Sequence, residues 1–184
     1  MKYLELRSKI ATNLFTFIDI VKFFPFDNPA LVKIQLQRFV RKKYITKIKR
    51  GLYCFFPDQI DEIKLANVLY QPSYISLETA LNYYGVIPDI PQIITSISPT
   101  TTKYIKNQFG IFTYTKIKQD LFWGYKITDE NTAIAKKEKA LLDYFYIRKI
   151  KFIADLRLNL KDFDRKLYKK YLKAFPVRLN RIKL

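Results

Sequence analysis

Residues 27–55 most constrain what this chain can fold into, because they join a helix directly to a short hairpin. A turn at Asp27 leads into Pro29, and proline suits the first position of a helix because no N–H donor is needed there. Apolar residues then recur at helical spacing and predict a buried face, namely Val32, Leu36, Phe39 and Val40. The opposite face would present small, amide and cationic side chains to solvent, namely Ala30, Lys33, Gln37, Arg38 and Arg41.

The residues after this helix predict a basic β-hairpin. Residues 44–48 alternate between apolar and polar side chains, residues 49–51 form a turn, and residues 52–55 supply a second short strand. The cations in and around this hairpin are Lys42, Lys43, Lys47, Lys49 and Arg50. A cationic helix followed at once by a basic hairpin is typical of a winged helix-turn-helix. In that fold the helix enters a DNA major groove and the wing lies along phosphates.

Two further helices complete the first predicted domain, residues 1–58. Residues 2–13 predict a helix with Leu4, Ile10 and Leu14 as its apolar markers, and Thr16 caps a second helix over residues 17–24. The aromatic residues of this region could stack on bases, but helical spacing favours a place in the core. They are Tyr3, Phe15, Phe17, Phe23, Phe24 and Phe26.

Residues 59–184 predict a compact mixed domain, so that the expected class of the whole chain is α+β. The pattern indicates helices at 60–71, 77–84, 136–149 and 164–175, with Ser76 as the cap of the second and Gly85 as its end. Strands are expected at 93–97, 111–117, 121–128 and 132–135, the second and third joined by a turn at 118–120. The last helix would bury Leu167, Tyr171, Leu172 and Phe175. A basic surface is expected from Lys136, Lys137, Arg165, Lys166, Lys169, Lys170, Lys173, Arg178 and Arg181.

The charge of the chain indicates a polyanionic partner. Its 34 Lys and Arg residues outnumber 16 Asp and Glu residues, which gives a net charge of +18. Residues 1–58 carry +8, residues 59–135 carry −1 and residues 136–184 carry +11, so two basic ends flank a neutral middle. The alternative is a lysine-rich but merely solvated surface; the uneven distribution favours nucleic acid.

The residues that most enzymes need are scarce. The chain has no histidine and one cysteine, Cys54, and its four glycines are widely separated. The expectation is therefore no enzyme, no metal and no cofactor. Asp58 followed by Glu62 and Lys64 superficially resembles a PD-(D/E)xK nuclease signature, but that site needs carboxylates on facing strands. Glu138 and Asp143 fit helix-dipole and ion-pair roles better than catalysis. Without an export signal or a long apolar run, a cytoplasmic protein that does not enter the membrane is expected.

Three motifs together resemble the AbiEi family. They are RGLY at residues 50–53, PSYISLETAL at 72–81 and AKKEKALLD at 135–143. The resemblance extends from residue 15 to at least residue 146. The family comprises antitoxins and autorepressors of type IV toxin–antitoxin systems. The resemblance implies an N-terminal winged helix that binds repeats in the protein's own promoter, followed by a C-terminal antitoxin domain. The implied partner is a nucleotidyltransferase-like toxin, opposed without a stable complex.

Two other functions remain open from the residues themselves. One is a winged-helix transcriptional regulator that opposes no toxin. The other is a non-specific RNA-binding protein, which would bind structured RNA as well as DNA and would prefer no particular duplex. If the resemblance to the AbiEi family holds, the basic surface of the second domain would bind tRNA, DNA or an acidic patch of the toxin.

Overall fold

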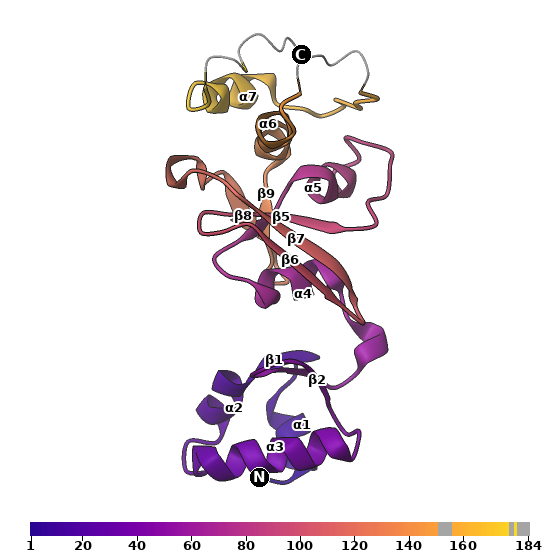
Figure 1. The fold of residues 1–184 in the computed structure, drawn as a ribbon, viewed down its shortest axis with the longest axis vertical. Helices are drawn as coiled ribbons and strands as arrows, with labels where there is room; N and C mark the ends of the chain where they lie inside the picture. The colour runs from indigo at the N-terminus through magenta and orange to yellow at the C-terminus, as the bar shows by residue number, and fades with distance from the viewer. Residues whose placement is uncertain (151–155, 177–178, 180–184) are drawn as a thin grey trace. The chain divides into compact units, whose positions relative to one another are not determined.

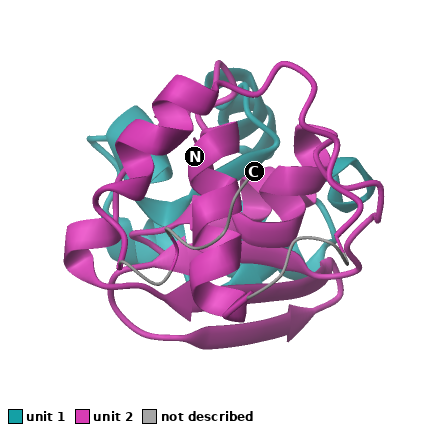
Figure 2. Ribbon diagram, turned by 90° about the horizontal axis from the view of Figure 1, so that it is seen from above, with its two compact units in different colours: residues 1–61 teal, residues 62–184 magenta. Residues whose placement is uncertain are grey.

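The computed structural model describes residues 1–150, 156–176 and 179. Within this part of the chain, seven α-helices and nine β-strands form two compact units, Met1–Asp61 and Glu62–Leu184 (Figures 1 and 2). Each unit has its own β-sheet. The expected α+β class is therefore confirmed.

The first unit combines three helices with a three-stranded sheet of order β1-β3-β2 (Figure 1). Its elements are α1 (Tyr3–Lys9), β1 (Leu14–Thr16), α2 (Phe17–Phe23), α3 (Pro29–Arg41), β2 (Thr46–Lys49), β3 (Leu52–Cys54) and the short 3-10 helix η1 (Pro57–Gln59). All three helices and the sheet region supply the core, which includes Leu6, Ile20, Leu36, Phe15 and Phe55. A small core of this kind depends on aromatic side chains because they bury the most area per residue.

The helix starts expected for α2 and α3 are confirmed by their capping contacts. The Thr16 hydroxyl accepts from the backbone N–H of Asp19 at 3.2 Å, and the Asp19 carboxylate accepts from the backbone N–H of Thr16 at 2.8 Å. The Asn28 side chain accepts from the backbone N–H of Ala30 at 2.9 Å, with Pro29 at the first helical position. These bonds satisfy donors that a helix leaves unpaired at its start.

The first helix is shorter than predicted, and of its three predicted apolar markers only Ile10 is buried, at 2% exposed. It ends at Lys9, and Leu14 belongs to β1, which pairs antiparallel with β3. Leu4 is 79% exposed, whereas Leu6 is fully buried. The periodicity of a three-residue strand is too short to distinguish it from the end of a helix. Leu14 was therefore assigned to the first helix instead of to β1.

The aromatic assignment holds only in part. Phe15 and Phe24 are buried, but Phe23 is 47% exposed and Phe26 is fully exposed in the turn after α2. Phe26 follows Pro25, outside any helix, so helical spacing could not place its side chain.

The second unit is built on a six-stranded mixed sheet of order β6-β7-β5-β4-β9-β8. The strands are β4 (Tyr74–Ile75), β5 (Ile94–Ser98), β6 (Lys103–Asn107), β7 (Gly110–Lys116), β8 (Tyr125–Ile127) and β9 (Ala133–Ala135). The helices are α4 (Glu62–Leu69), α5 (Leu77–Tyr83), α6 (Lys137–Arg148) and α7 (Arg165–Leu172), with a 3-10 helix η2 at Gln119–Leu121.

The predicted hairpin between residues 111–117 and 121–128 is wrong. The strand β7 pairs with β6 and β5, whereas β8 pairs with β9. The true hairpin partner, β6, was missed because its sequence, KYIKN, is too polar to read as a strand. Residue 108 and Phe109 form the turn between the paired Asn107 and Gly110.

Helices cover both faces of this sheet (Figure 1). The Tyr114 hydroxyl donates to the carbonyl of Ala66 in α4 at 2.7 Å, on one face. On the other face, Thr95 is hydrogen-bonded to Thr79 of α5. Helix α6 packs on α5, and α7 packs on α6. As a result α6 is an inner layer, with neighbours on both sides.

The last helix also differs from its prediction. It begins after Asp164, whose carboxylate accepts from the backbone N–H groups of Lys166 and Leu167 at 2.9 Å. Its most buried side chain is Tyr168, while the expected Leu167, Tyr171 and Leu172 are half-buried. Phe175 is buried, as expected.

None of the helices in the described ranges has both the length and the apolar character needed to cross a bilayer.

Candidate nucleic-acid interface

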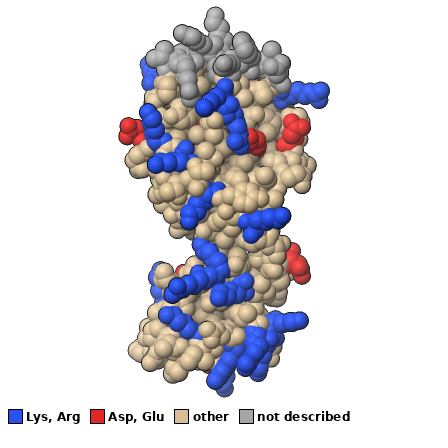
Figure 3. All heavy atoms as spheres, viewed as in Figure 1, with Lys and Arg blue, Asp and Glu red and all other residues tan. Residues whose placement is uncertain are grey.

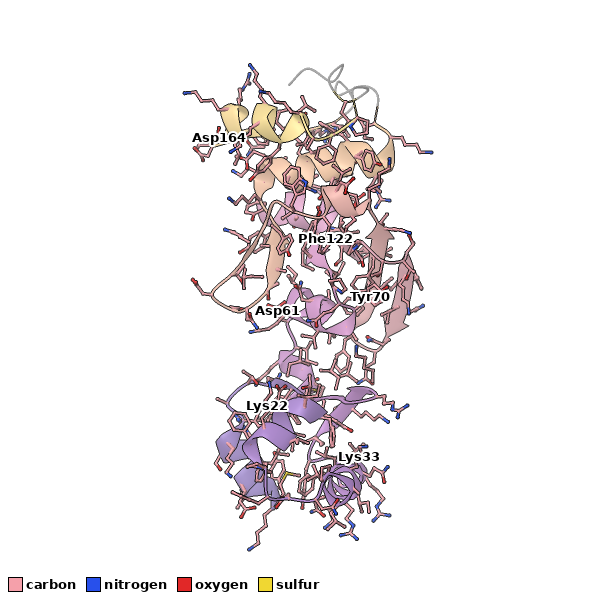
Figure 4. All side chains as sticks on the ribbon, turned by 90° about the vertical axis from the view of Figure 1, so that its left-hand side faces the viewer. Lys22, Lys33, Asp61, Tyr70, Phe122 and Asp164 are labelled. Atoms are coloured by element: carbon pink, nitrogen blue, oxygen red, sulfur yellow. The ribbon has the colours of Figure 1, made fainter. Side chains whose placement is uncertain are left out.

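The outward face of α3 carries all five side chains that the sequence placed there. Val32, Leu36 and Phe39 are buried on the opposite side. All five predicted residues are exposed, namely Ala30, Lys33, Gln37, Arg38 and Arg41. Figure 4 shows the side chains of α3, Lys33 among them, pointing outward from the helix, and in Figure 3 lysine and arginine side chains gather over its C-terminal end.

This face is cationic and carries no carboxylate of its own. The helix contains no Asp or Glu. Among the described residues, no carboxylate forms an ion pair with Lys33, Arg38 or Arg41. The Arg38 guanidinium lies 3.5 Å from the Gln35 amide oxygen, and the Lys33 ammonium lies 5.2 Å from the centre of the Phe17 ring. These cations therefore keep most of their charge available to an anion.

Two exposed apolar residues on the same helix were missed by the sequence analysis. Leu31 is 64% exposed and Ile34 is 46% exposed. Ile34 lies four residues after Ala30 and three before Gln37, so helical spacing alone could have placed it on the outward face. The error was to treat the outward face as polar throughout.

The C-terminus of α3 leads into the hairpin through a Schellman motif. The backbone N–H of Tyr44 donates to the carbonyl of Phe39 at 2.9 Å, and that of Lys43 donates to Val40 at 3.0 Å. Lys43 has φ 58°, the left-handed conformation that usually selects glycine. Lys42 and Lys43 are both exposed at this point.

The predicted hairpin is present as β2 and β3. Lys47 pairs in register with Tyr53, and a bulge follows before Lys49 pairs with Leu52. Gly51 has φ +78° in the turn. The hairpin cations Lys47, Lys49 and Arg50 are exposed. Burial raises the pKa of the Cys54 thiol in β3 to about 11, so this cysteine is a core residue rather than a nucleophile.

The helix face and the hairpin are tied together through α2. The backbone N–H of Phe17 donates to the carbonyl of Gly51 at 2.8 Å, which fixes the hairpin turn against the start of α2. The ring of Phe17 in turn lies beneath the Lys33 ammonium of α3. The cations of α3 and those of the hairpin thus belong to one packed unit.

The second unit has a basic surface of its own. Lys136, Arg165, Lys166, Lys169, Lys170 and Lys173 are exposed. Lys137 is half-buried, and its ammonium donates to the backbone carbonyls of Lys161 at 3.4 Å and Asp162 at 3.3 Å. Arg178 and Arg181, also predicted for this surface, lie outside the described residues.

A buried polar cluster also lies in the second unit. Lys139 and Asp143 of α6 form an ion pair in which neither side chain is exposed. The hydroxyls of Ser76 and Tyr74 donate to the second carboxylate oxygen of Asp143 at 2.9 and 3.0 Å. Burial lowers the pKa of Lys139 and raises the pKa of Asp143, and the attraction between the two opposes both shifts.

The stem of Lys139 runs directly over Gly124. A Cβ added to Gly124 would lie 2.9 Å from the Cγ of Lys139, so only glycine fits at this position. The ammonium is surrounded by the rings of Trp123, Phe175 and Tyr74 at 5.2 to 5.4 Å. This enclosed arrangement stabilises a charge inside the fold.

The residues of the nuclease-like pattern do not lie on facing strands. Asp58 is in η1, and Glu62 and Lys64 are in α4. The Lys64 ammonium lies 3.5 Å from the Glu130 carboxylate. In the described part of the chain, no group of three or more Cys, Asp or Glu residues is placed to hold a metal ion.

The chain matches no protein-family model, and a search of the curated proteins finds no relative.

Proposed function

We propose that the first unit is a winged helix-turn-helix that binds double-stranded DNA, with α3 as its recognition helix and the β2–β3 hairpin as its wing. One observation carries this proposal. An exposed helix face without carboxylates adjoins a cationic hairpin, and both belong to one packed unit. Such a face can enter a major groove while the hairpin follows the phosphates.

The side chains of the two elements suit different tasks. Arginine and lysine can bind the O6 and N7 atoms of guanine, and glutamine can bind adenine, so Lys33, Gln37 and Arg38 would read bases. Lys47, Lys49 and Arg50 on the hairpin would bind phosphates, together with Lys42 and Lys43 at the end of α3. Arg41, in the last turn of α3, would contact either bases or phosphates.

The resemblance of the three sequence motifs to the AbiEi family supports a more specific role. The protein would repress its own operon by binding repeats in the promoter. The second unit would oppose a nucleotidyltransferase-like toxin. A cytoplasmic location follows from this role.

DNA binding is tested by gel shift of the full chain on the DNA upstream of its own gene. Scrambled duplex and tRNA serve as competitors, at low and near-physiological salt. The proposal expects the upstream complex to survive both competitors at the higher salt. Loss of every complex with rising salt would overturn it, since charge alone then explains binding. Preference for tRNA would favour an RNA-binding protein instead.

The antitoxin role is tested by expressing the full chain together with a nucleotidyltransferase-like protein from a neighbouring gene. Wild-type chain should restore growth. A chain carrying Lys33→Ala and Arg38→Ala should lose repression and still restore growth, because neutralisation is assigned to the second unit. Failure of the wild-type chain to restore growth would leave a DNA-binding regulator without an antitoxin role.

A further inference from the structure

Two large apolar side chains stand exposed on the outward face of α3. Leu31 is 64% exposed and Ile34 is 46% exposed. Ile34 has exposed neighbours on the helix surface one turn before and one turn after, namely Ala30, Leu31, Gln37 and Arg38. It therefore lies within the proposed recognition face and not at its margin.

The fold itself gives no reason for an isoleucine at this position. At 100° per residue, Ile34 points about 160° away from both Val32 and Leu36, the buried side of the helix. A β-branched residue is also a poorer helix former than the alanine, lysine or glutamine that would suit an exposed site. Ile34 thus neither fills the core of the first unit nor favours the helix.

The ligand that suits this side chain can be identified from the chemistry of the groove. In a major groove, the apolar group that base edges present is the C5 methyl of thymine. Lys33 and Arg38, on either side of Ile34, would hold the helix close to the bases, and the small Ala30 leaves room for close approach. A methyl buried against isoleucine loses contact with water, which favours binding.

We propose that Ile34, with Leu31 beside it, contacts the C5 methyl groups of thymines in the DNA site of this protein. The inference rests on the proposed function, and it adds a preference for thymine at defined positions. The contact between Ile34 and a thymine methyl group involves no charge. Unlike the phosphate contacts of the hairpin, it should therefore not weaken as the salt concentration rises.

The test uses deoxyuridine, which differs from thymidine only by the missing C5 methyl. Each thymine of the bound upstream duplex is replaced in turn, and affinity is measured for wild type, Ile34→Ala and Leu31→Ala at near-physiological salt. Wild type should lose about fourfold in affinity at one or two positions, the effect of one buried methyl. Ile34→Ala should bind the unmodified duplex less tightly by a similar factor and show no further loss at the Ile34 position. Leu31→Ala should keep the affinity loss caused by deoxyuridine at the Ile34 position. It should abolish such a loss at most at one neighbouring thymine.

A matched control is available in the same unit. Ile18 of α2 is 65% exposed but lies off the α3 face, so Ile18→Ala should keep the wild-type deoxyuridine profile. Alanine favours a helix, and circular dichroism would verify that each variant is folded.

Three results would overturn the inference. The first is a deoxyuridine loss that is the same in wild type and Ile34→Ala, because the methyl then contacts another residue. The second is the absence of any deoxyuridine effect on a duplex that wild type prefers over scrambled DNA, which leaves the proposed function standing. The third is no preference for the upstream duplex at all, which overturns the proposed function as well.

Discussion

Helices α3 and α6 both carry several charged residues, yet they use them in opposite ways. On α3, Lys33, Arg38 and Arg41 are exposed. On α6, Lys139 and Asp143 are fully buried, and Glu138 is 6% exposed. The difference follows from position, because α3 presents one face to solvent whereas α6 packs between α5 and α7. Charged residues can form a binding surface only on a helix face that is exposed to solvent.

The buried charges of α6 are tolerated because each has partners within the fold. Asp143 receives three donors, from Lys139, Ser76 and Tyr74, while the backbone N–H of Asp164 donates to Glu138 at 3.1 Å. Removing one member of such a cluster leaves the others buried without compensation. The α3 cations have no comparable role, so their loss should affect binding and leave stability nearly unchanged.

The largest effect is expected for Lys139→Met, which keeps the length of the side chain and removes its charge. Asp143 would stay buried without its cation, and the free energy of unfolding should fall by about 3–5 kcal/mol. Urea denaturation monitored by circular dichroism measures this. The control Lys136→Met lies at the exposed start of the same helix and should change stability by less than about 0.5 kcal/mol.

The double variant Lys139→Met/Asp143→Asn separates charge from packing. Asparagine still accepts hydrogen bonds from Ser76 and Tyr74, so the double variant should recover most of the lost stability. If it is as unstable as the single variant, or less stable, the ion pair is not the reason for the loss.

The Lys139→Met variant should also respond to pH. Burial raises the pKa of Asp143 above its unfolded value of about 3.9, and Lys139 opposes this rise, so removing Lys139 should raise the pKa further than in wild type. Stabilisation by protonation is complete below the unfolded pKa and is lost as pH rises through the folded pKa. The deficit relative to wild type should therefore shrink between pH 7 and pH 4. An equal deficit at both pH values would contradict this origin.

A smaller effect, on binding rather than stability, is expected from the α3 face and the hairpin. Lys33→Ala or Gln37→Ala should reduce the preference for upstream over scrambled duplex by about 1–3 kcal/mol. Lys47→Ala or Lys49→Ala should weaken both duplexes alike and lower the salt slope by about 1. Fluorescence anisotropy over a salt series measures both quantities. If the helix variants and the hairpin variants change duplex preference and salt slope in the same way, the assignment of bases to α3 and phosphates to the hairpin is wrong.

The smallest effect is expected at Lys43, where a substitution should change both the stability of the first unit and its binding to DNA. Its left-handed backbone is strained for lysine, so Lys43→Gly should raise the free energy of unfolding by about 0.5–1 kcal/mol while weakening DNA binding. Lys42 has φ −81°, so Lys42→Gly should weaken binding similarly but lower stability. Two variants of equal stability would show that the Lys43 conformation is not strained.

The sequence predicted those parts of the structure that local patterns determine. The cap at Thr16, the start of α3 at Pro29, the buried stripe of α3 and the left-handed Gly85 all depend on residues a few positions apart. The α3 cations were placed outward for the same reason. Leu31 and Ile34 show the limit of this approach, since a polar pattern was extended over two apolar residues.

The features that were missed depend on distant partners. Ser76 occupies the predicted cap position of α5, but its hydroxyl donates to Asp143, 67 residues away, instead of capping the helix. The spacing of Lys139 and Asp143 suggests an ion pair, yet only the packing of α5, α6 and α7 buries it. Strands β1, β4 and β6 are defined by pairing with neighbours and not by their own composition.

The central claim is that DNA binds to α3 and the β2–β3 hairpin and not simply to the most basic end of the chain. Amide hydrogen exchange of the full chain, measured by mass spectrometry with and without the upstream duplex, tests it most directly. We expect slower exchange at Pro29–Arg41 and in the hairpin strands Thr46–Lys49 and Leu52–Cys54, with α7 unchanged. Slower exchange at Arg165–Leu172 without any change in α3 or the hairpin would contradict the account.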